Sequence, residues 1–262
     1  MGLLDFIDKS INACFACLPR KAPDKNRMEA VQLIAHRGAH SKKHNAIENT
    51  HAAFEHAHKL GCWGIELDVQ VTADDVLVVN HDPDLKRLWN HDVAINTISF
   101  KQLREYAPLV PTLAEVVERY SQRMHLFIEL KAPFTAEVAL LSTLGSLTPC
   151  VDYHLLSLEE PLLASLTVFP RQSLLLVAGH NNTAHFCNLS LQNQYGGVLG
   201  HYLLLNKTHL TKLRRAEQKA GVGFIASKFS LYREVERGIT WVFSDNAIQV
   251  SAYLNRDEHP DR

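Results

Sequence analysis

The chain lacks several features that mark secreted, membrane-spanning or nucleic-acid-binding proteins. It has five cysteines in 262 residues, an odd number that does not suit the paired framework of a secreted disulfide protein. Cys14 and Cys17 form a C-x-x-C pair, but nothing near them completes a zinc site. Its 27 basic and 28 acidic residues give a net charge of −1, so no overall attraction to nucleic acid is expected. We therefore expect a reducing, cytoplasmic location and a locally charged site.

Long hydrophobic runs are also absent. The run 11–18 falls well short of the roughly 20 apolar residues that span a bilayer, so no transmembrane segment is expected. The first residues lack the basic region and cleavage site of a signal peptide. Residues 3–18 place apolar side chains near helical spacing, which predicts an amphipathic helix. We expect this helix to dock on the main domain, with peripheral contact to a partner or a membrane as the alternative.

The rest of the sequence alternates short apolar runs with helix-patterned stretches. This alternation is typical of a parallel sheet covered by helices, and the length suits an α/β TIM barrel with a short N-terminal helical extension. The pattern alone leaves an open, doubly wound sheet as an alternative. We divide the chain into an N-terminal helix and linker, 1–28, and a barrel domain, 29–262. The expected strands are 31–35, 62–71, 76–80, 125–130, 153–157, 173–177, 197–199, 223–226 and 239–243.

One pair of strands breaks the alternation. Only four residues, 72–75, separate two apolar runs, which is too few for a crossover helix and predicts an antiparallel hairpin. A turn centred on residues 73 and 74 places Glu66 opposite His81 and Asp68 opposite Val79, whereas a slip on each side places Asp68 opposite His81. In both registers two carboxylates converge on a histidine.

Acidic residues lie at matching positions of two expected strands. Glu66 and Asp68 are two residues apart, so both side chains point to one face, and Glu129 and Lys131 repeat this spacing. Three gathered carboxylates repel one another unless a cation neutralises them, and oxygen ligands suit magnesium or calcium. We therefore predict a divalent metal, Mg2+ or Ca2+, held by these three acids. For any single acid, a surface charge or salt bridge is the alternative.

The first expected strand ends in His36, Arg37 and Gly38. The guanidinium fork matches a phosphate, glycine allows close approach of the backbone to a ligand, and histidine transfers protons near neutral pH. This tripeptide suggests phosphate chemistry. A capped strand with solvent-facing side chains is the alternative for the tripeptide alone.

Taken in order, these motifs resemble the glycerophosphodiester phosphodiesterase family over roughly residues 31–250. The motifs are His36-Arg37-Gly38, Glu48-Asn49-Thr50, Glu66-Leu67-Asp68-Val69, His81-Asp82, Pro111-Thr112-Leu113-Ala114-Glu115, Glu129-Leu130-Lys131 and Ser244-Asp245-Asn246. The resemblance implies a distorted TIM barrel that hydrolyses small glycerophosphodiesters to an alcohol and sn-glycerol 3-phosphate. Without a long insertion before Glu129, the chain resembles the compact bacterial type more than the larger secreted enzymes.

The resemblance also implies a role for each site residue. The implied roles are acid–base catalysis for His36 and His81, metal binding for Glu66, Asp68 and Glu129, phosphate binding for Arg37 and Lys131, and support of Arg37 or His36 for Glu48. A place for Glu48 among the metal ligands is the alternative. In the family, the neighbouring hydroxyl of glycerol attacks first, and water then opens the cyclic phosphate.

Three departures from the family pattern concern the substrate more than the reaction. Residues 224–228 read Phe-Ile-Ala-Ser-Lys where a strand ending in Trp-Thr-Val-Asn is common, Ile47 replaces a proline, and Asp75 replaces a turn glycine. Two other functions remain as alternatives: a phospholipase D-like lyase that stops at a cyclic phosphate, and a catalytically silent barrel that acts as a binding module. The sequence does not indicate an oligomeric state.

Overall fold

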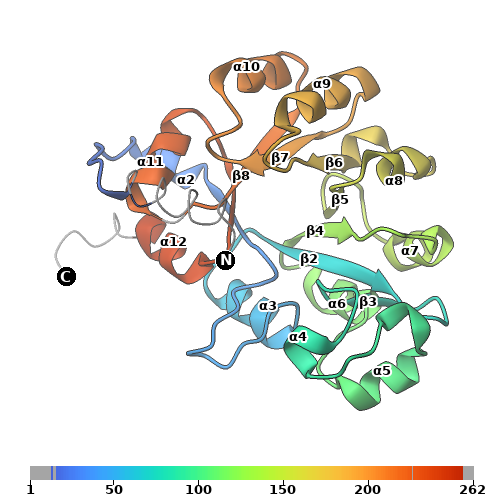
Figure 1. Ribbon diagram of the computed structural model, residues 1–262. Coiled ribbons are helices and arrows are strands. Elements are labelled where there is room, and N and C mark those ends of the chain that lie inside the picture. The colour runs from blue at the N-terminus through green and yellow to red at the C-terminus, as the bar shows by residue number, and fades with distance from the viewer. Residues whose placement is uncertain (1–12, 14–15, 226, 256–262) are drawn as a thin grey trace.

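Strands form where the sequence has short apolar runs, because both faces of a barrel strand are buried. The computed structural model describes residue 13, residues 16–225 and residues 227–255 (Figure 1). The barrel strands are β1 (Gln32–Ala35), β2 (Gly64–Val71), β4 (His125–Leu130), β5 (Tyr153–Ser157), β6 (Leu174–Val177), β7 (Gly197–His201), β8 (Lys219–Gly223) and β9 (Trp241–Ser244). Strands β4 and β5 coincide with the predicted ranges, and every residue in them is buried.

The eight parallel strands close into a barrel. Their order is β1-β9-β8-β7-β6-β5-β4-β2, and a parallel pairing of β1 with β2 completes the circle. Closure brings the two ends of the domain together, because Ala35 of β1 pairs with Ser244 of β9. The predicted TIM barrel is therefore confirmed, and the open-sheet alternative is wrong.

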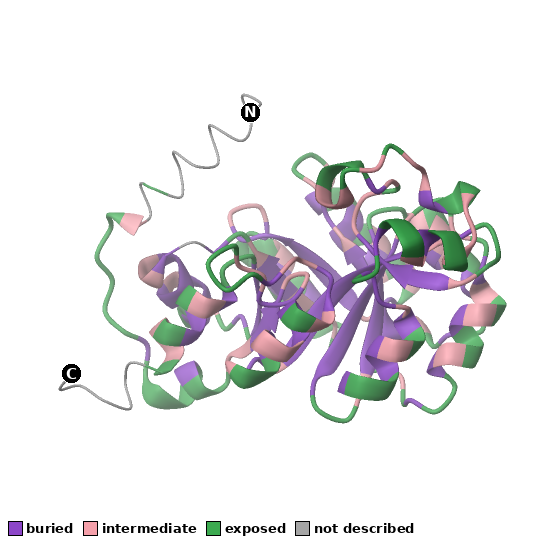
Figure 2. Cartoon of the chain, turned by 90° about the horizontal axis from the view of Figure 1, so that it is seen from below, coloured by how far each residue is buried: buried purple, intermediate pink, exposed green. Residues whose placement is uncertain are grey.

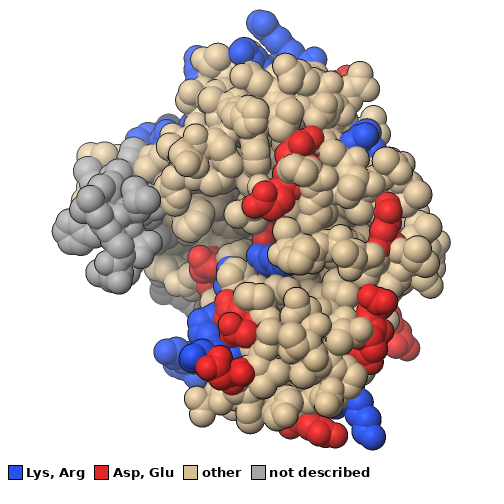
Figure 3. Space-filling view, turned by 45° about the vertical axis from the view of Figure 1, so that its right-hand side comes forward, with Lys and Arg blue, Asp and Glu red and all other residues tan. Residues whose placement is uncertain are grey.

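Helices cover the outside of the barrel, and their buried faces turn toward the strands (Figures 1 and 2). The α-helices are α2 (Lys25–Glu29), α3 (His51–Lys59), α4 (Lys86–Trp89), α5 (Phe100–Tyr106), α6 (Leu113–Tyr120), α7 (Glu137–Leu144), α8 (Glu160–Ser165), α9 (Thr183–Asn193), α10 (Lys207–Arg215), α11 (Lys228–Glu236) and α12 (Ala247–Leu254). Two short 3-10 helices are η1 (Ile95–Thr97) and η2 (Arg171–Ser173). Basic side chains lie beside acidic ones on the face shown in Figure 3, in keeping with the balanced charge.

Large apolar side chains fill the barrel, so its centre is a packed core rather than a pore. The interior cluster consists of Ile34, Phe127, Leu156, Leu175, Leu199, Trp241 and Phe243, with Trp63 and Val177 packed against it. Two buried histidines, His125 and His154, lie in the first two residues of β4 and β5 beside this cluster, and Trp63 stacks on His125 at a centroid distance of 4.6 Å. A cavity in this barrel therefore has to lie at the ends of the strands and not at its centre.

The hairpin forms between β2 and β3 (Leu77–Val79), but both predicted registers are wrong by one residue. Asn80 lies beside Asp68 and donates its backbone N–H to the Asp68 carbonyl at 3.0 Å. The turn holds three residues, because Thr72 donates to the carbonyl of Val76 at 3.1 Å. Asp75 adopts a left-handed φ of 59° in this turn, a conformation in which glycine is common. The additional turn residue shifts the pairing.

The predicted strand over residues 223–226 is also wrong. β8 lies earlier, and the chain leaves it at Phe224, which has a φ of 65°. Two glycines make β8 a poor match to any strand pattern. One of them is required by packing, since a Cβ on Gly221 would lie 2.6 Å from a side-chain carbon of Leu199.

The N-terminal prediction falls mostly outside the described part of the chain. The amphipathic helix proposed for residues 3–18 includes residues 3–12 and 14–15, and with them Cys14, which the structure does not describe. Among the residues that are described, no helix has the length and apolar character needed to cross a bilayer. The division at residue 28 remains a prediction.

Candidate active site

A cavity of about 250 Å³ lies where the carboxyl ends of the barrel strands meet. This end of a TIM barrel is where active sites form, because the strand ends and the loops after them converge there. Six predicted site residues line the cavity: His36, Arg37, Glu66, His81, Glu129 and Lys131. Two more, Asp68 and Glu48, contact residues in its wall. Barrel closure therefore gathers all eight residues at one place.

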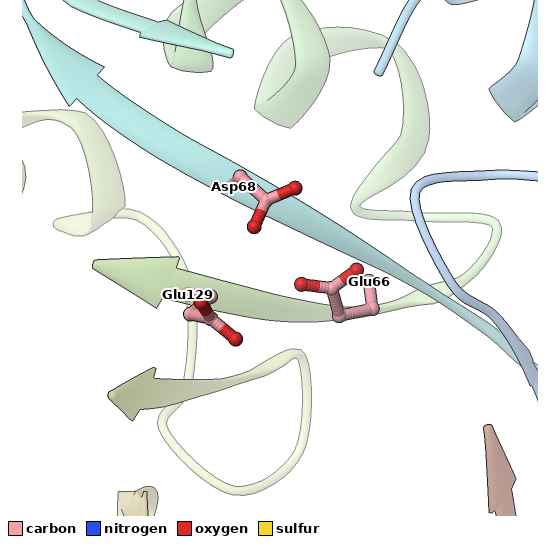
Figure 4. Close-up of side chains that lie close together, drawn as sticks. All are labelled: Glu66, Asp68 and Glu129. Carbon is pink, nitrogen blue, oxygen red and sulfur yellow. The ribbon is translucent and has the colours of Figure 1, made fainter. Parts of the chain in front are cut away.

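The three predicted metal-binding acids form one buried group (Figure 4). Glu66 and Asp68 extend from β2 and Glu129 from the neighbouring β4, where Asp68 and Glu129 occupy paired positions. One oxygen from each carboxylate lies within 4.8 Å of the others. Among the described residues, Glu66 Oε1 is buried and has no hydrogen-bond partner. This donor set fits a hard divalent cation.

Two cations of the protein also contact this acidic group. Lys131 Nζ lies 2.6 Å from Asp68 Oδ1 and also bonds to Glu129. Arg37 Nε lies 3.3 Å from Asp68 Oδ2. Burial opposes ionisation of Asp68, but the positive charges of Lys131 and Arg37 outweigh it and lower the pKa of that carboxyl. Lys131, predicted as a phosphate ligand, is therefore held by two predicted metal ligands.

Glu66 has less compensation for its charge. Its Oε2 accepts the Arg37 backbone N–H at 3.0 Å, but burial and the nearby charge of Asp68 raise the pKa of Glu66 above its ordinary value. A buried carboxylate whose charged form is disfavoured is stabilised by a bound cation. The incompletely compensated charge of Glu66 is thus the feature that most favours a metal here.

A tight turn after β1 directs the Arg37 backbone toward Glu66. Arg37 and Gly38 have positive φ values of 56° and 79°. A side chain at Gly38 would meet Ala53 Cβ at 2.8 Å and Phe54 at 2.9 Å, so this position accommodates only glycine without rearrangement. The strained Arg37 backbone is a local cost that positions a functional group.

Each predicted catalytic histidine is bonded through Nδ1 to a carboxylate. His36 Nδ1 bonds to Asp245, which follows β9, while His36 Nε2 lies 3.7 Å from Glu66 Oε2. His81 Nδ1 lies 2.8 Å from Asp82 Oδ1. Burial opposes protonation of His36, but the charges of Glu66 and Asp245 outweigh it and raise the pKa of His36 to about 9. In both pairs Nε2 is the ring nitrogen left for proton transfer.

Glu48 does not line the cavity itself but bonds to the guanidinium of Arg37, which does. Its Oε1 accepts a hydrogen bond from Arg37 Nη1 at 3.0 Å. A second arginine, Arg87 of α4, bonds to both oxygens of Glu48. Glu48 lies outside the group of acids that could hold a metal among the described residues.

The opposite wall of the cavity is apolar. Its side chains are Leu156, Leu158, Val177, Ala178, Leu199, Phe224 and Phe243. Leu158 and Phe224 are 46% and 53% exposed, so they lie at the rim. Phe224 thus contributes to the cavity wall at the stretch where the sequence departs from the family pattern.

Sequence reasoning did not assign roles to Asp82, Asp245 and Arg87. The first two stand in the quoted motifs, and Asp245 follows a strand end as the other site residues do, which was the available signal. Asn49, another motif residue, donates its Nδ2 to Asp68 Oδ2 at 2.8 Å. Arg87 lies in the segment between β3 and β4, residues 80–124, which we call the β3–β4 excursion. This segment carries no periodic pattern, so only the structure places Arg87 at the site.

A model of the glycerophosphoryl diester phosphodiesterase family matches residues 36–143, a range that contains all eight predicted site residues. Over this range the chain is similar to that family. It is 37% identical to the glycerophosphodiester phosphodiesterase of Bacillus altitudinis over 111 residues, covering 38% of this chain and 44% of that protein. The chain thus matches less than half the length of this curated relative.

Solved structures extend the likeness over most of the barrel. A glycerophosphodiester phosphodiesterase of Thermotoga maritima has a TM-score of 0.73 at 25% identity and covers 84% of this chain and 96% of its own. An Oleispira antarctica phosphodiesterase, in complex with its product sn-glycerol-3-phosphate, also has a TM-score of 0.73, at 23% identity, covering 86% and 96% of the two chains. The second likeness establishes the fold alone.

Proposed function

We propose that the protein is a metal-dependent glycerophosphodiester phosphodiesterase that releases sn-glycerol 3-phosphate and an alcohol. The observation that carries this proposal is the convergence, in one cavity, of three buried carboxylates with two histidines that each bond to a separate acid. The match to the family model over residues 36–143 and the product bound to the Oleispira antarctica protein support the substrate class. A cytoplasmic location remains part of the proposal, supported by the odd cysteine count.

Glu66, Asp68 and Glu129 would hold the divalent ion, Mg2+ or Ca2+, since all their donor atoms are oxygens. When bound, such an ion polarises a phosphoryl oxygen as a Lewis acid. Arg37 and Lys131 line the same cavity and supply positive charge for the phosphate. Glu48 holds the Arg37 guanidinium in place through the hydrogen bond at 3.0 Å.

The two histidines carry the protons. One accepts the proton of the attacking hydroxyl through Nε2, and the other protonates the oxygen of the leaving alcohol. Asp245 and Asp82 bond to the Nδ1 atoms of His36 and His81 and fix the ring orientations. We propose that the neighbouring hydroxyl of glycerol attacks first and that water then opens the cyclic phosphate, so a glycerol group is required.

Product analysis tests the proposal. The protein is incubated with glycerophosphocholine, glycerophosphoethanolamine or glycerophosphoglycerol in the presence of magnesium, calcium or EDTA, and phosphorus NMR identifies the products. We expect metal-dependent glycerol 3-phosphate that is lost in His36→Ala and retained in His58→Ala, a change of an exposed histidine on α3. A cyclic phosphate as the final product would replace hydrolysis with the lyase reaction. Absence of any product would favour the silent binding module.

A further inference from the structure

Arg87 of α4 forms a bridge between two carboxylates without lining the cavity. Its Nε lies 2.5 Å from Asp82 Oδ2, and its Nη2 and Nη1 lie 2.6 Å and 3.2 Å from the two oxygens of Glu48. A guanidinium presents donors in a rigid fork, so it can hold two acids in a fixed relative position. Arg87 therefore fixes Asp82 and Glu48 relative to each other.

Besides Arg87, each of these two carboxylates contacts a residue that lines the cavity. Asp82 Oδ1 lies 2.8 Å from His81 Nδ1, and Glu48 Oε1 lies 3.0 Å from Arg37 Nη1. The result is a continuous series of polar contacts that runs from His81 to Arg37 through Arg87. It connects a predicted proton-transfer residue with a predicted phosphate ligand.

Charge and burial show how strongly the two acids depend on Arg87. The side chains of Glu48 and Asp82 are only 13% and 21% exposed. Burial opposes ionisation of both, but hydrogen bonds from Arg87 and the remaining cationic partners outweigh it and lower the pKa of each carboxyl. Loss of Arg87 would leave each acid with one cationic or histidine partner, free to turn toward water.

The segment that carries Arg87 is itself well anchored. It packs on a small separate core of Val78, Leu85, Ile95, Leu103, Ala107 and Val110. Trp89 donates from Nε1 to Asn80 Oδ1 at 3.2 Å, and Asn80 donates from Nδ2 to the Asp82 carbonyl at 2.8 Å. The excursion between β3 and β4 thus holds α4 against the loop that bears His81.

We propose that Arg87 is a positioning residue that couples the orientation of the His81 imidazole to that of the Arg37 guanidinium. For its kinetic consequences the proposal rests on the proposed function above. The structural part, the fixed orientation and tautomer of His81, does not depend on any substrate.

The first test reads the His81 tautomer directly. Long-range proton–nitrogen NMR spectra of histidine-labelled protein report which ring nitrogen carries the proton, and the His81→Gln spectrum assigns the signal. We expect protonation at Nδ1 in the unaltered protein and a mixture of tautomers in Arg87→Gln. An unchanged His81 signal in Arg87→Gln would overturn the proposal, whether or not the protein is active.

The second test is kinetic and includes a matched control. Arg104 also binds a carboxylate, Glu115, within the same excursion, so Arg104→Gln removes a comparable ion pair away from the site. We expect Arg87→Gln to lower kcat by about 10- to 100-fold with an increase in KM, and Arg104→Gln to stay within about twofold. Equal losses in both variants, at matched thermal stability, would show that Arg87 only stabilises the segment.

Arg87→Lys and a double variant complete the test. A single ammonium cannot reproduce the fork, so Arg87→Lys should keep the melting temperature but not recover kcat. Arg87→Gln combined with Asp82→Asn should lose little more activity than the worse single variant, because both break the same series of contacts. The proposed bridge would be contradicted if Arg87→Lys recovered the full kcat. It would also be contradicted if the activity losses of the two single variants multiplied in the double variant. If the unaltered protein releases no product, the proposed function fails and the NMR spectrum alone decides the role of Arg87.

Discussion

Asp68 and Glu129 occupy paired positions on the neighbouring strands β2 and β4, and the Lys131 ammonium bonds to both carboxylates. The protein therefore already places one cation at the acidic group, while Glu66 keeps an oxygen without a hydrogen-bond partner among the described residues. A divalent ion would compete with Lys131 for the same oxygens and would also satisfy Glu66.

Metal binding should therefore stabilise the fold through Glu66. We expect Mg2+ or Ca2+ at 100 times its dissociation constant to stabilise the protein by about 2.7 kcal/mol, measured as a rise in melting temperature. Glu66→Gln should not lower the melting temperature of the metal-free protein, because it replaces a buried carboxyl group whose ionised form is disfavoured. It should abolish the rise with metal, whereas Glu118→Gln, an exposed change on α6, should retain it. A full rise in Glu66→Gln would exclude Glu66 from the metal site.

Packing around Gly38 gives a second prediction. Gly38→Ala combines a left-handed φ with a close approach to Ala53 and Phe54, so it should lower the free energy of unfolding by about 2 kcal/mol or more. Gly61 provides the control, since it has a similar φ of 72° and nothing within 4 Å of a new Cβ. Gly61→Ala should lower the free energy of unfolding only by the cost of the left-handed backbone conformation, about 1 to 2 kcal/mol. Equal losses in urea denaturation would mean that the clash at Gly38 is relieved without cost.

The histidine pair at the base of the barrel predicts a pH dependence of stability. Burial lowers the pKa of His125 to about 4 and that of His154 to about 3, against an ordinary value of 6.5. Between pH 6.5 and these lowered pKa values, the unfolded chain binds more protons than the folded protein. The contribution of the two neutral histidines to the free energy of unfolding should therefore be complete above pH 6.5. It should fall below that pH by about 1.4 kcal/mol per pH unit for each histidine.

Urea denaturation between pH 7.5 and pH 4.5 measures this slope. His154→Gln should reduce it, and His58→Gln, at an exposed position, should leave it unchanged. A slope that His154→Gln does not alter would assign the acid sensitivity to other groups.

Strands with continuous apolar runs could be predicted from the sequence, whereas strands shaped by packing could not. β4 and β5 match their predicted ranges because every residue is buried. β8 was misplaced because Gly221 is selected by contact with Leu199 on the neighbouring strand β7, which leaves no local signal. The hairpin register was wrong by one residue because Asp75 adopts a left-handed conformation that a non-glycine residue seldom signals.

The same distinction applies to the site. Seven of the eight predicted residues stand on strands or within two residues of a strand end, and the closed barrel brings these strands together whatever the details of the loops. Glu48 is the exception, since it lies in the loop between β1 and α3. Partners that depend on distant contacts were not assigned. Asp245 reaches His36 only because β9 pairs with β1, and Arg87 reaches Glu48 through an excursion with its own small core.

The most direct test of the central claim is the rate of glycerol 3-phosphate release after chelation, measured while magnesium or calcium is added back. The account predicts no release without metal, saturable recovery in the unaltered protein, and no recovery in Asp68→Asn at any metal concentration at which that variant remains folded. Undiminished release in EDTA, or normal recovery in Asp68→Asn, would contradict a metal-dependent reaction at this group of acids.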